Sequence, residues 1–150
     1  MNMVIQEPVH NYECRVRYGD TDSGGVVYYA NYLRYFEAAR TEFMRKFIVS
    51  YRELEDMGFI LPVTECKARY KAPALYDDLL QVETCLQDVK IYSCRFNYRI
   101  VRKENNKLLV KGYTVHATIN REYKLAKFPD SLLEKLKSFS GSSGQQVVWP

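Results

Sequence analysis

The sequence predicts an α+β fold in which a curved antiparallel sheet wraps one long central helix. Residues 28–47 repeat apolar side chains at helical spacing and contain neither Gly nor Pro. Residues 79–122 alternate as an antiparallel meander does, with one face covered and the other wetter. One helix cannot bury its own apolar stripe, so we expect the apolar face of the sheet to cover it.

The first predicted elements are a strand over 10–18, a glycine-containing loop over 19–27 and the long helix. The strand alternates, so its apolar side chains share one side. They are Tyr12, Cys14, Val16 and Tyr18. The apolar stripe of the helix has one charged member, Arg40, and is flanked by Tyr32 and Ala39. It consists of Tyr29, Leu33, Phe36, Arg40, Phe43 and Phe47.

A second, short helix is predicted over 50–57, where Ser50 is the N-cap, Glu53 has the capping-box spacing and Gly58 ends it. Pro129 opens a last helix over 130–138. The remaining segments are predicted strands, at 62–71, 79–90, 92–102 and 108–122, with a polar turn at 103–107. On the last strand one side carries Tyr113, Val115, Ala117 and Ile119. We therefore predict one domain over 1–139 and a flexible tail over 140–150.

Composition favours a folded domain and argues against several classes of function. The chain is 47% hydrophobic and 14% aromatic, which supports a core. The net charge of +4 is spread among charges of both signs, so we expect no nucleic-acid binding. No apolar run approaches the roughly 20 residues of a spanning helix, and no signal peptide is evident. We expect a cytoplasmic protein without membrane insertion.

The cysteines and the sheet edge carry two further expectations. Cys14, Cys66, Cys85 and Cys94 show no CxxC and no metal-ligand spacing, which predicts reduced, mostly buried thiols and no metal site. A curved sheet of this kind leaves an exposed edge strand. Because a second copy can pair with that edge, we expect a homodimer.

The stretch between the first strand and the long helix is the best candidate for chemistry. Asp22 precedes Gly24 and Gly25, which let the backbone turn sharply and approach a ligand. The first N–H groups of the helix lack intrahelical partners and can hold an oxyanion beside the acid. Asp22 can therefore attack a carbonyl or activate water. By spacing alone, however, most loop aspartates of this kind are the acid of an Asx turn or an N-cap.

The other polar residues near this loop each have two interpretations. Tyr28 and Tyr29 can wall an acyl pocket or simply pack, and Asn31 can cap the helix or bind a water. Asp20 fits a role in loop geometry better than one in reaction, and Glu42 is an alternative general base. The two histidines, His10 and His116, have no nucleophile motif near them. The chain also lacks a P-loop and GxGxxG, which argues against kinase and dehydrogenase chemistry.

The stretch YGDTDSGGVVYYANYLRYFEAARTE at 18–42 resembles the signature of the 4-hydroxybenzoyl-CoA thioesterase family of the hotdog superfamily. It looks most similar to the acyl-CoA thioesterase branch associated with the Tol–Pal system. Segments 72–80 and 82–84 resemble the family further along, so the resemblance covers residues 10–128. The matching signature residues are Asp20-Thr21-Asp22, Gly25, Val27, Tyr29, Asn31-Tyr32, Phe36-Glu37 and Arg40.

This resemblance implies a hotdog fold, working as a dimer or a homotetramer, that hydrolyses an acyl-CoA to free acid and CoA. It implies that Asp22 is the nucleophile or general base and that the backbone N–H of Tyr29 polarises the thioester carbonyl. No cofactor is implied, because CoA is part of the substrate. The implied substrate-binding residues are Gly25, Val27, Tyr28, Asn31 and Tyr32, with Lys90 and Ser93 near the CoA nucleotide.

The acyl group and two rival functions stay open. Several members of the Tol–Pal branch have His where this chain has Tyr29, and the aromatic-acyl thioesterases have Tyr there. The substrate is thus a short aliphatic or an aromatic acyl-CoA. One rival is a hotdog enoyl-CoA hydratase or dehydratase, which needs a His with a carboxylate near the reacting carbons. The other is a non-catalytic acyl-CoA binder or interaction protein.

Overall fold

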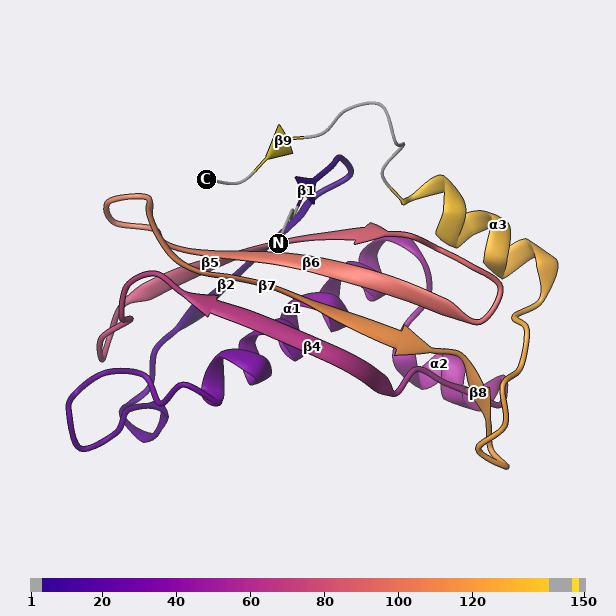
Figure 1. The fold of residues 1–150 in the computed structure, drawn as a ribbon, viewed down its shortest axis with the longest axis horizontal. Coiled ribbons are helices and arrows are strands. Elements are labelled where there is room, and N and C mark those ends of the chain that lie inside the picture. Colours follow the sequence, from indigo (N-terminus) through magenta and orange to yellow (C-terminus); the bar gives the residue numbers. More distant parts are fainter. Residues whose placement is uncertain (1–3, 141–146, 149–150) are drawn as a thin grey trace.

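One long helix, α1 (Asn31–Phe47), lies against one face of a five-stranded antiparallel sheet (Figure 1). The computed structural model describes residues 4–140 and 147–148. The strands follow one another across the sheet in the order β2 (His10–Arg15), β5 (Leu79–Gln87), β6 (Ser93–Arg102), β7 (Lys107–Ala117) and β4 (Val63–Tyr70). This arrangement confirms the predicted α+β hotdog fold and the meander of β5, β6 and β7.

Smaller elements close the two ends of the sheet. The loop between β2 and α1, with the short 3-10 helix η1 (Tyr18–Asp20), lies at one end (Figure 1). The other end carries α2, α3 and the small pair of β3 and β8 (Figure 1). The bounds of these elements are α2 Tyr51–Asp56, α3 Asp130–Ser138, β3 Phe59–Ile60 and β8 Ile119–Asn120, and a separate pair joins β1 (Val4–Ile5) to β9 (Val147–Val148).

The core forms where α1 meets β6 and β7. The ring of Phe36 stacks on that of Tyr98 with centroids 4.2 Å apart, and Phe43 meets Phe96 edge to face at 5.8 Å. Gly112 makes this contact possible: a Cβ there would lie 2.4 Å from the carbonyl oxygen of Lys67 and 2.9 Å from the ring of Phe36. The Phe36 ring of α1 thus packs on β7 where that strand has no side chain.

Both short helices begin as the sequence predicts. The hydroxyl of Ser50 accepts a hydrogen bond from the amide of Glu53 at 3.1 Å, which is the predicted N-cap of α2. Helix α3 follows Pro129, and its three leucines at 132, 133 and 136 join the core. The Nζ of Lys135 donates to the carbonyl oxygen of Ile48 at 2.8 Å and ties α3 to the end of α1.

Two boundaries next to the candidate site and one stripe differ from prediction. The first strand ends at Arg15, not Tyr18, because η1 follows, and α1 begins at Asn31, not Tyr28. The buried stripe is rotated from the predicted one: Tyr29 is 62% exposed and Leu33 is 41% exposed. A period of 3.6 residues allows two overlapping stripes, and packing against the sheet decides between them. The stripe actually buried is Tyr32, Tyr35, Phe36, Ala39, Phe43 and Met44.

Strand β7 covers the core with its more polar side. The predicted apolar side, with Tyr113, Val115 and Ala117, is only half-buried, and Ile119 belongs to β8. Thr114 and His116 are buried instead. Hydrogen bonds permit this burial: Tyr98 Oη lies 2.6 Å from Thr114 Oγ1, which lies 2.8 Å from His116 Nε2.

The remaining predictions on the fold have mixed outcomes. All four cysteines are free thiols; Cys85 and Cys94 are buried, Cys14 is half-buried and Cys66 is exposed on β4. The predicted exposed edge is β4, in which every residue except Ala68 is exposed. In the described part of the chain no helix is long and apolar enough to cross a membrane. Most of the predicted tail over 140–150 lies outside the described residues.

Candidate active site at the start of the long helix

Asp22 forms a tight turn that leaves part of its carboxylate open. Its Oδ1 accepts hydrogen bonds from the amides of Gly24 at 2.8 Å and Val26 at 3.4 Å. The amide of Asp22 donates to the carbonyl of Val26 at 2.8 Å, which closes the loop. Gly25 has a φ of +83°, a conformation that favours glycine. The side chain of Asp22 is exposed, and among the hydrogen bonds of the described residues its Oδ2 has no donor.

The backbone N–H of Tyr29 is a fixed donor without an acceptor. The carbonyl oxygen of Tyr28 accepts the amide of Asn31 at 2.8 Å, and this bond fixes the peptide plane that carries the Tyr29 N–H. None of the hydrogen bonds within residues 4–140 uses that N–H as donor. Because it lies at the N-terminal end of α1, the helix dipole adds to its attraction for negative charge.

Asp20 holds this helix entrance in place through four hydrogen bonds. Its carbonyl oxygen accepts the amide of Tyr28 at 2.9 Å and Nδ2 of Asn31 at 2.8 Å. Its Oδ2 accepts the amide of Arg17 and the hydroxyl of Tyr35, both at 2.9 Å. Burial, together with the bond to Asp20, raises the pKa of the Tyr35 phenol and keeps it a donor. The supporting role of Asp20 was predicted; that of Tyr35 was not.

A cavity of about 310 Å³ opens beside the Tyr29 amide. Its aromatic walls are Tyr29, Tyr32 and Tyr70, with ring centroids 5.4 Å apart for Tyr32 and Tyr70 and 6.5 Å apart for Tyr29 and Tyr70. Val27 and residues 71–73 complete the lining. The hydroxyl of Tyr70 donates to the carbonyl oxygen of Tyr29 at 3.0 Å. Sequence reasoning missed Tyr70, which lies 41 residues downstream at the end of β4.

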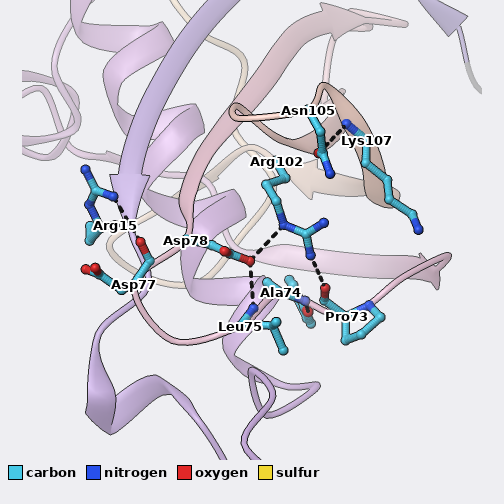
Figure 2. Close-up of polar contacts among 10 residues, drawn as sticks. Arg15, Pro73, Ala74, Leu75, Asp77, Asp78, Arg102, Asn105 and Lys107 are labelled. Atoms are coloured by element: carbon cyan, nitrogen blue, oxygen red, sulfur yellow. Dashed lines mark hydrogen bonds and ion pairs between the residues drawn. The ribbon is translucent and has the colours of Figure 1, made fainter.

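The cavity-lining residues 71–73 begin a segment, 71–78, that Arg102 on β6 holds in place (Figure 2). Arg102 Nε contacts Asp78 Oδ2 at 2.9 Å, and its Nη2 donates to the carbonyl of Pro73 at 2.8 Å. Ala74 connects this segment to the site: its carbonyl accepts the Val27 amide at 2.9 Å, and its own amide donates to the Tyr32 hydroxyl at 3.1 Å. Arg102 thereby fixes a wall of the cavity from outside it.

Seven of the nine predicted site residues are brought together and two are not. Val27, Tyr28, Asn31 and Tyr32 lie around Tyr29, and Asp22 and Gly25 belong to the loop just before it, which the Asp22–Val26 hydrogen bond closes. Lys90 lies in the turn between β5 and β6 and Ser93 begins β6, and the Lys90 amide donates to the Ser93 carbonyl at 2.8 Å. Nine-residue β5 separates that turn from the site by about 27 Å. One chain alone therefore does not place them near Asp22.

The alternative acids and bases lie elsewhere. Glu42 is ion-paired with Arg45 on α1. His116 is buried and its Nδ1 bonds the Leu61 carbonyl at 3.0 Å, while His10 lies near Phe47. Within residues 4–140 and 147–148, His, Cys, Asp and Glu form no group of three that could hold a metal ion.

Comparison with known proteins agrees with this geometry. A family model described as a thioesterase-like superfamily matches residues 16–136. A putative esterase of Aquifex aeolicus is 36% identical over 126 residues, covering 84% of this chain and 96% of its own. The acyl-CoA thioester hydrolase YbgC of Escherichia coli O6:H1 is 35% identical over 123 residues, covering 82% and 92%.

A solved structure supports the same assignment. Slr0204, a 1,4-dihydroxy-2-naphthoyl-CoA thioesterase from Synechocystis, superposes with a TM-score of 0.78 at 26% identity, covering 86% of this chain and 96% of that one. The fold is that of a hotdog thioester hydrolase. This chain belongs to the thioesterase-like superfamily.

Proposed function

We propose that the protein hydrolyses an acyl-CoA to free acid and CoA, with Asp22 and the Tyr29 amide as its catalytic groups. The observation that carries the proposal is that one loop-to-helix segment holds both an open carboxylate oxygen on Asp22 and a fixed N–H of Tyr29 that has no acceptor within residues 4–140. If the oxygen of a thioester carbonyl binds that N–H, the negative charge that develops on this oxygen during attack is stabilised by a donor already in place. The tyrosine-lined cavity beside it receives the acyl group.

Two routes use these groups. In the first, Asp22 Oδ2 attacks the carbonyl carbon, the C–S bond breaks, CoA leaves as thiolate and takes a proton, and water then hydrolyses the mixed anhydride. In the second, Asp22 takes a proton from a water that attacks the carbonyl directly, and CoA leaves from the tetrahedral intermediate. In both, the Tyr29 amide stabilises the oxyanion, and neither needs a cofactor.

The cavity supports a compact acyl group, either short aliphatic or aromatic. Three tyrosine rings line a space of about 310 Å³, and their faces suit an aromatic acyl group as well as an alkyl chain. The naphthoyl-CoA thioesterase supports the aromatic class, while the YbgC relative is named only as an acyl-CoA thioester hydrolase. A panel of acetyl-, butyryl-, hexanoyl- and benzoyl-CoA, compared by kcat/KM, separates them.

The decisive test of the chemistry is Asp22→Asn in a thiol-release assay. We expect kcat to fall roughly 10²–10⁴-fold, because the amide can neither attack nor accept a proton. Asp56→Asn, an exposed aspartate at the end of α2, is the matched control and should keep full turnover. Turnover of Asp22→Asn within twofold of wild type would overturn the assignment. Hydration of an enoyl-CoA by the wild type would instead favour the hydratase.

A second copy of the chain completes the site in this proposal. β4 is an exposed edge strand that ends at Tyr70, a wall of the cavity, so an edge-paired partner lies beside the acyl pocket. We expect a dimer or tetramer by light scattering. Val63→Arg on β4 should weaken it, whereas Met57→Arg, at a similarly exposed position just after α2, should not. A fully active monomer would refute this part.

Lys90 and Ser93 retain a proposed role in binding the CoA nucleotide, supplied by a neighbouring copy. Because one chain keeps them about 27 Å from the site, their effect depends on assembly. Lys90→Gln should raise KM for acyl-CoA without changing kcat. A cytoplasmic location also stays a prediction.

A further inference from the structure

A second cavity, of about 400 Å³, lies between edge strand β2 and the first half of α1, and no residue lines both cavities. Three arginines line it: Arg15 at the end of β2, Arg17 just before η1, and Arg34 on α1. They come from three successive elements, so the fold gathers them and the sequence alone does not. We call this cavity the arginine groove.

The carboxylates of the arginine groove do not neutralise its arginines. Glu13 is ion-paired with Lys103, and Asp20 accepts the Arg17 amide and the Tyr35 hydroxyl. Among the ion pairs of the described residues, none joins a carboxylate to Arg15, Arg17 or Arg34. The groove therefore carries an excess of positive charge, which a bound anion would offset.

Part of the arginine groove is already fixed for binding. Arg15 Nη1 donates to the main-chain carbonyl of Asp77 at 2.9 Å, which holds its guanidinium at the groove (Figure 2). Neither Arg17 nor Arg34 uses its guanidinium in a hydrogen bond within residues 4–140. Because β2 is a sheet edge, it also leaves some backbone N–H groups without a partner strand on this side.

The chemistry of the lining selects the ligand class. Guanidinium groups bind phosphate oxygens through paired, charge-assisted hydrogen bonds. Three guanidinium groups offer more hydrogen-bond donors than the two oxygens of one carboxylate can accept. A space of about 400 Å³ is in the range of small-molecule sites. We propose that the arginine groove binds a phosphate-bearing ligand through Arg15, Arg17 and Arg34. That ligand is either the phosphate end of CoA or a separate phosphorylated molecule.

The binding test uses pyrophosphate and adenosine 3′,5′-bisphosphate in titration calorimetry, without turnover. The triple variant Arg15→Gln/Arg17→Gln/Arg34→Gln should weaken binding by at least about tenfold. The charge-matched control, Arg52→Gln/Lys124→Gln/Lys137→Gln, removes three cations outside the groove and should bind as wild type. Should the triple variant fail to fold, Arg34→Gln alone tests the same contact from an exposed helix position.

Kinetics distinguish the two sources of phosphate. For the phosphate end of CoA, the Arg variants raise KM for acyl-CoA but not for the matching acyl-pantetheine, which has no nucleotide. For a separate ligand, both KM values stay unchanged while calorimetric binding is lost. Equal affinity of wild type and Arg variants for both probes, or no binding by the wild type, would overturn the proposal. Because calorimetry needs no turnover, this result is independent of the proposed hydrolysis.

Discussion

The hydroxyl of Tyr35, buried on α1, donates to Oδ2 of Asp20 at 2.9 Å. This bond reaches the active site indirectly, because the carbonyl of Asp20 holds both the Tyr28 amide and the Asn31 side chain. Those two bonds anchor Tyr28 and Asn31, the residues whose own hydrogen bond fixes the peptide plane of the Tyr29 N–H. A side chain in the core thus positions a backbone donor at the surface.

Tyr35→Phe should lower kcat about tenfold and leave KM nearly unchanged, because the oxyanion donor is displaced while the cavity is kept. Its stability cost should be about 0.5–1.5 kcal/mol. Tyr98→Phe is the matched control: it removes a buried hydroxyl bonded to Thr114, so it should cost similar stability without lowering kcat. A fall in kcat for both variants would show a general packing effect instead.

Arg102→Gln should raise KM and destabilise the fold by roughly 1–3 kcal/mol, measured by urea unfolding. The change leaves the Asp78 carboxylate without its cation and releases the carbonyl of Pro73 at the cavity wall. Arg99→Gln loses a comparable pair with Glu83, away from that wall, and should leave KM unchanged. An unaltered KM in Arg102→Gln would mean that the contacts of Arg102 with Asp78 and Pro73 do not shape the cavity.

Gly112→Ala should destabilise the protein by roughly 1–3 kcal/mol, because the added methyl meets the Lys67 carbonyl at 2.4 Å. The ring of Phe36 blocks relief on the other side at 2.9 Å. Gly19→Ala is the control, since nothing lies within 4 Å of its added Cβ, and we expect a change below about 0.5 kcal/mol. Equal thermal midpoints for the two variants would contradict the close contact between Gly112 and the Phe36 ring of α1.

Stability should fall as the pH drops from about 6.5 toward 4, in part through His116. Burial, aided by the charge of Arg40, lowers the pKa of His116 to about 4. His116 therefore binds a proton below about pH 6.5 in the unfolded chain but only near pH 4 in the folded chain. This linkage should cost about 1–3 kcal/mol by pH 4.

His116→Gln should flatten the pH dependence of the unfolding free energy over that range, whatever its absolute stability. His10→Gln is the comparison, because His10 is half-buried and burial also lowers its pKa. A slope in His116→Gln as steep as in the wild type would assign the effect to other groups.

Much of the fold could be predicted because its signals are local. The Ser50 cap, the alternation of β5 and β6 and the uninterrupted helix pattern each lie within a few neighbouring residues. The rotated stripe of α1 and the polar inner side of β7 could not. Whether Leu33 or Tyr35 is buried depends on where the sheet lies. The burial of His116 depends on a hydrogen bond between its Nδ1 and the carbonyl oxygen of Leu61, 55 residues away.

For the site, the sequence by itself determined the reacting segment: Asp22, the glycines after it and the helix start are neighbours in the chain, so their chemistry is readable without a fold. Only the tertiary structure decided what surrounds them. Tyr70, Arg102 and Tyr35 contribute through contacts between elements far apart in sequence, and the three arginines of the groove meet only because β2 lies beside α1. Burial and hydrogen bonding between distant segments leave no periodic signal in the chain, and the structure alone supplies them.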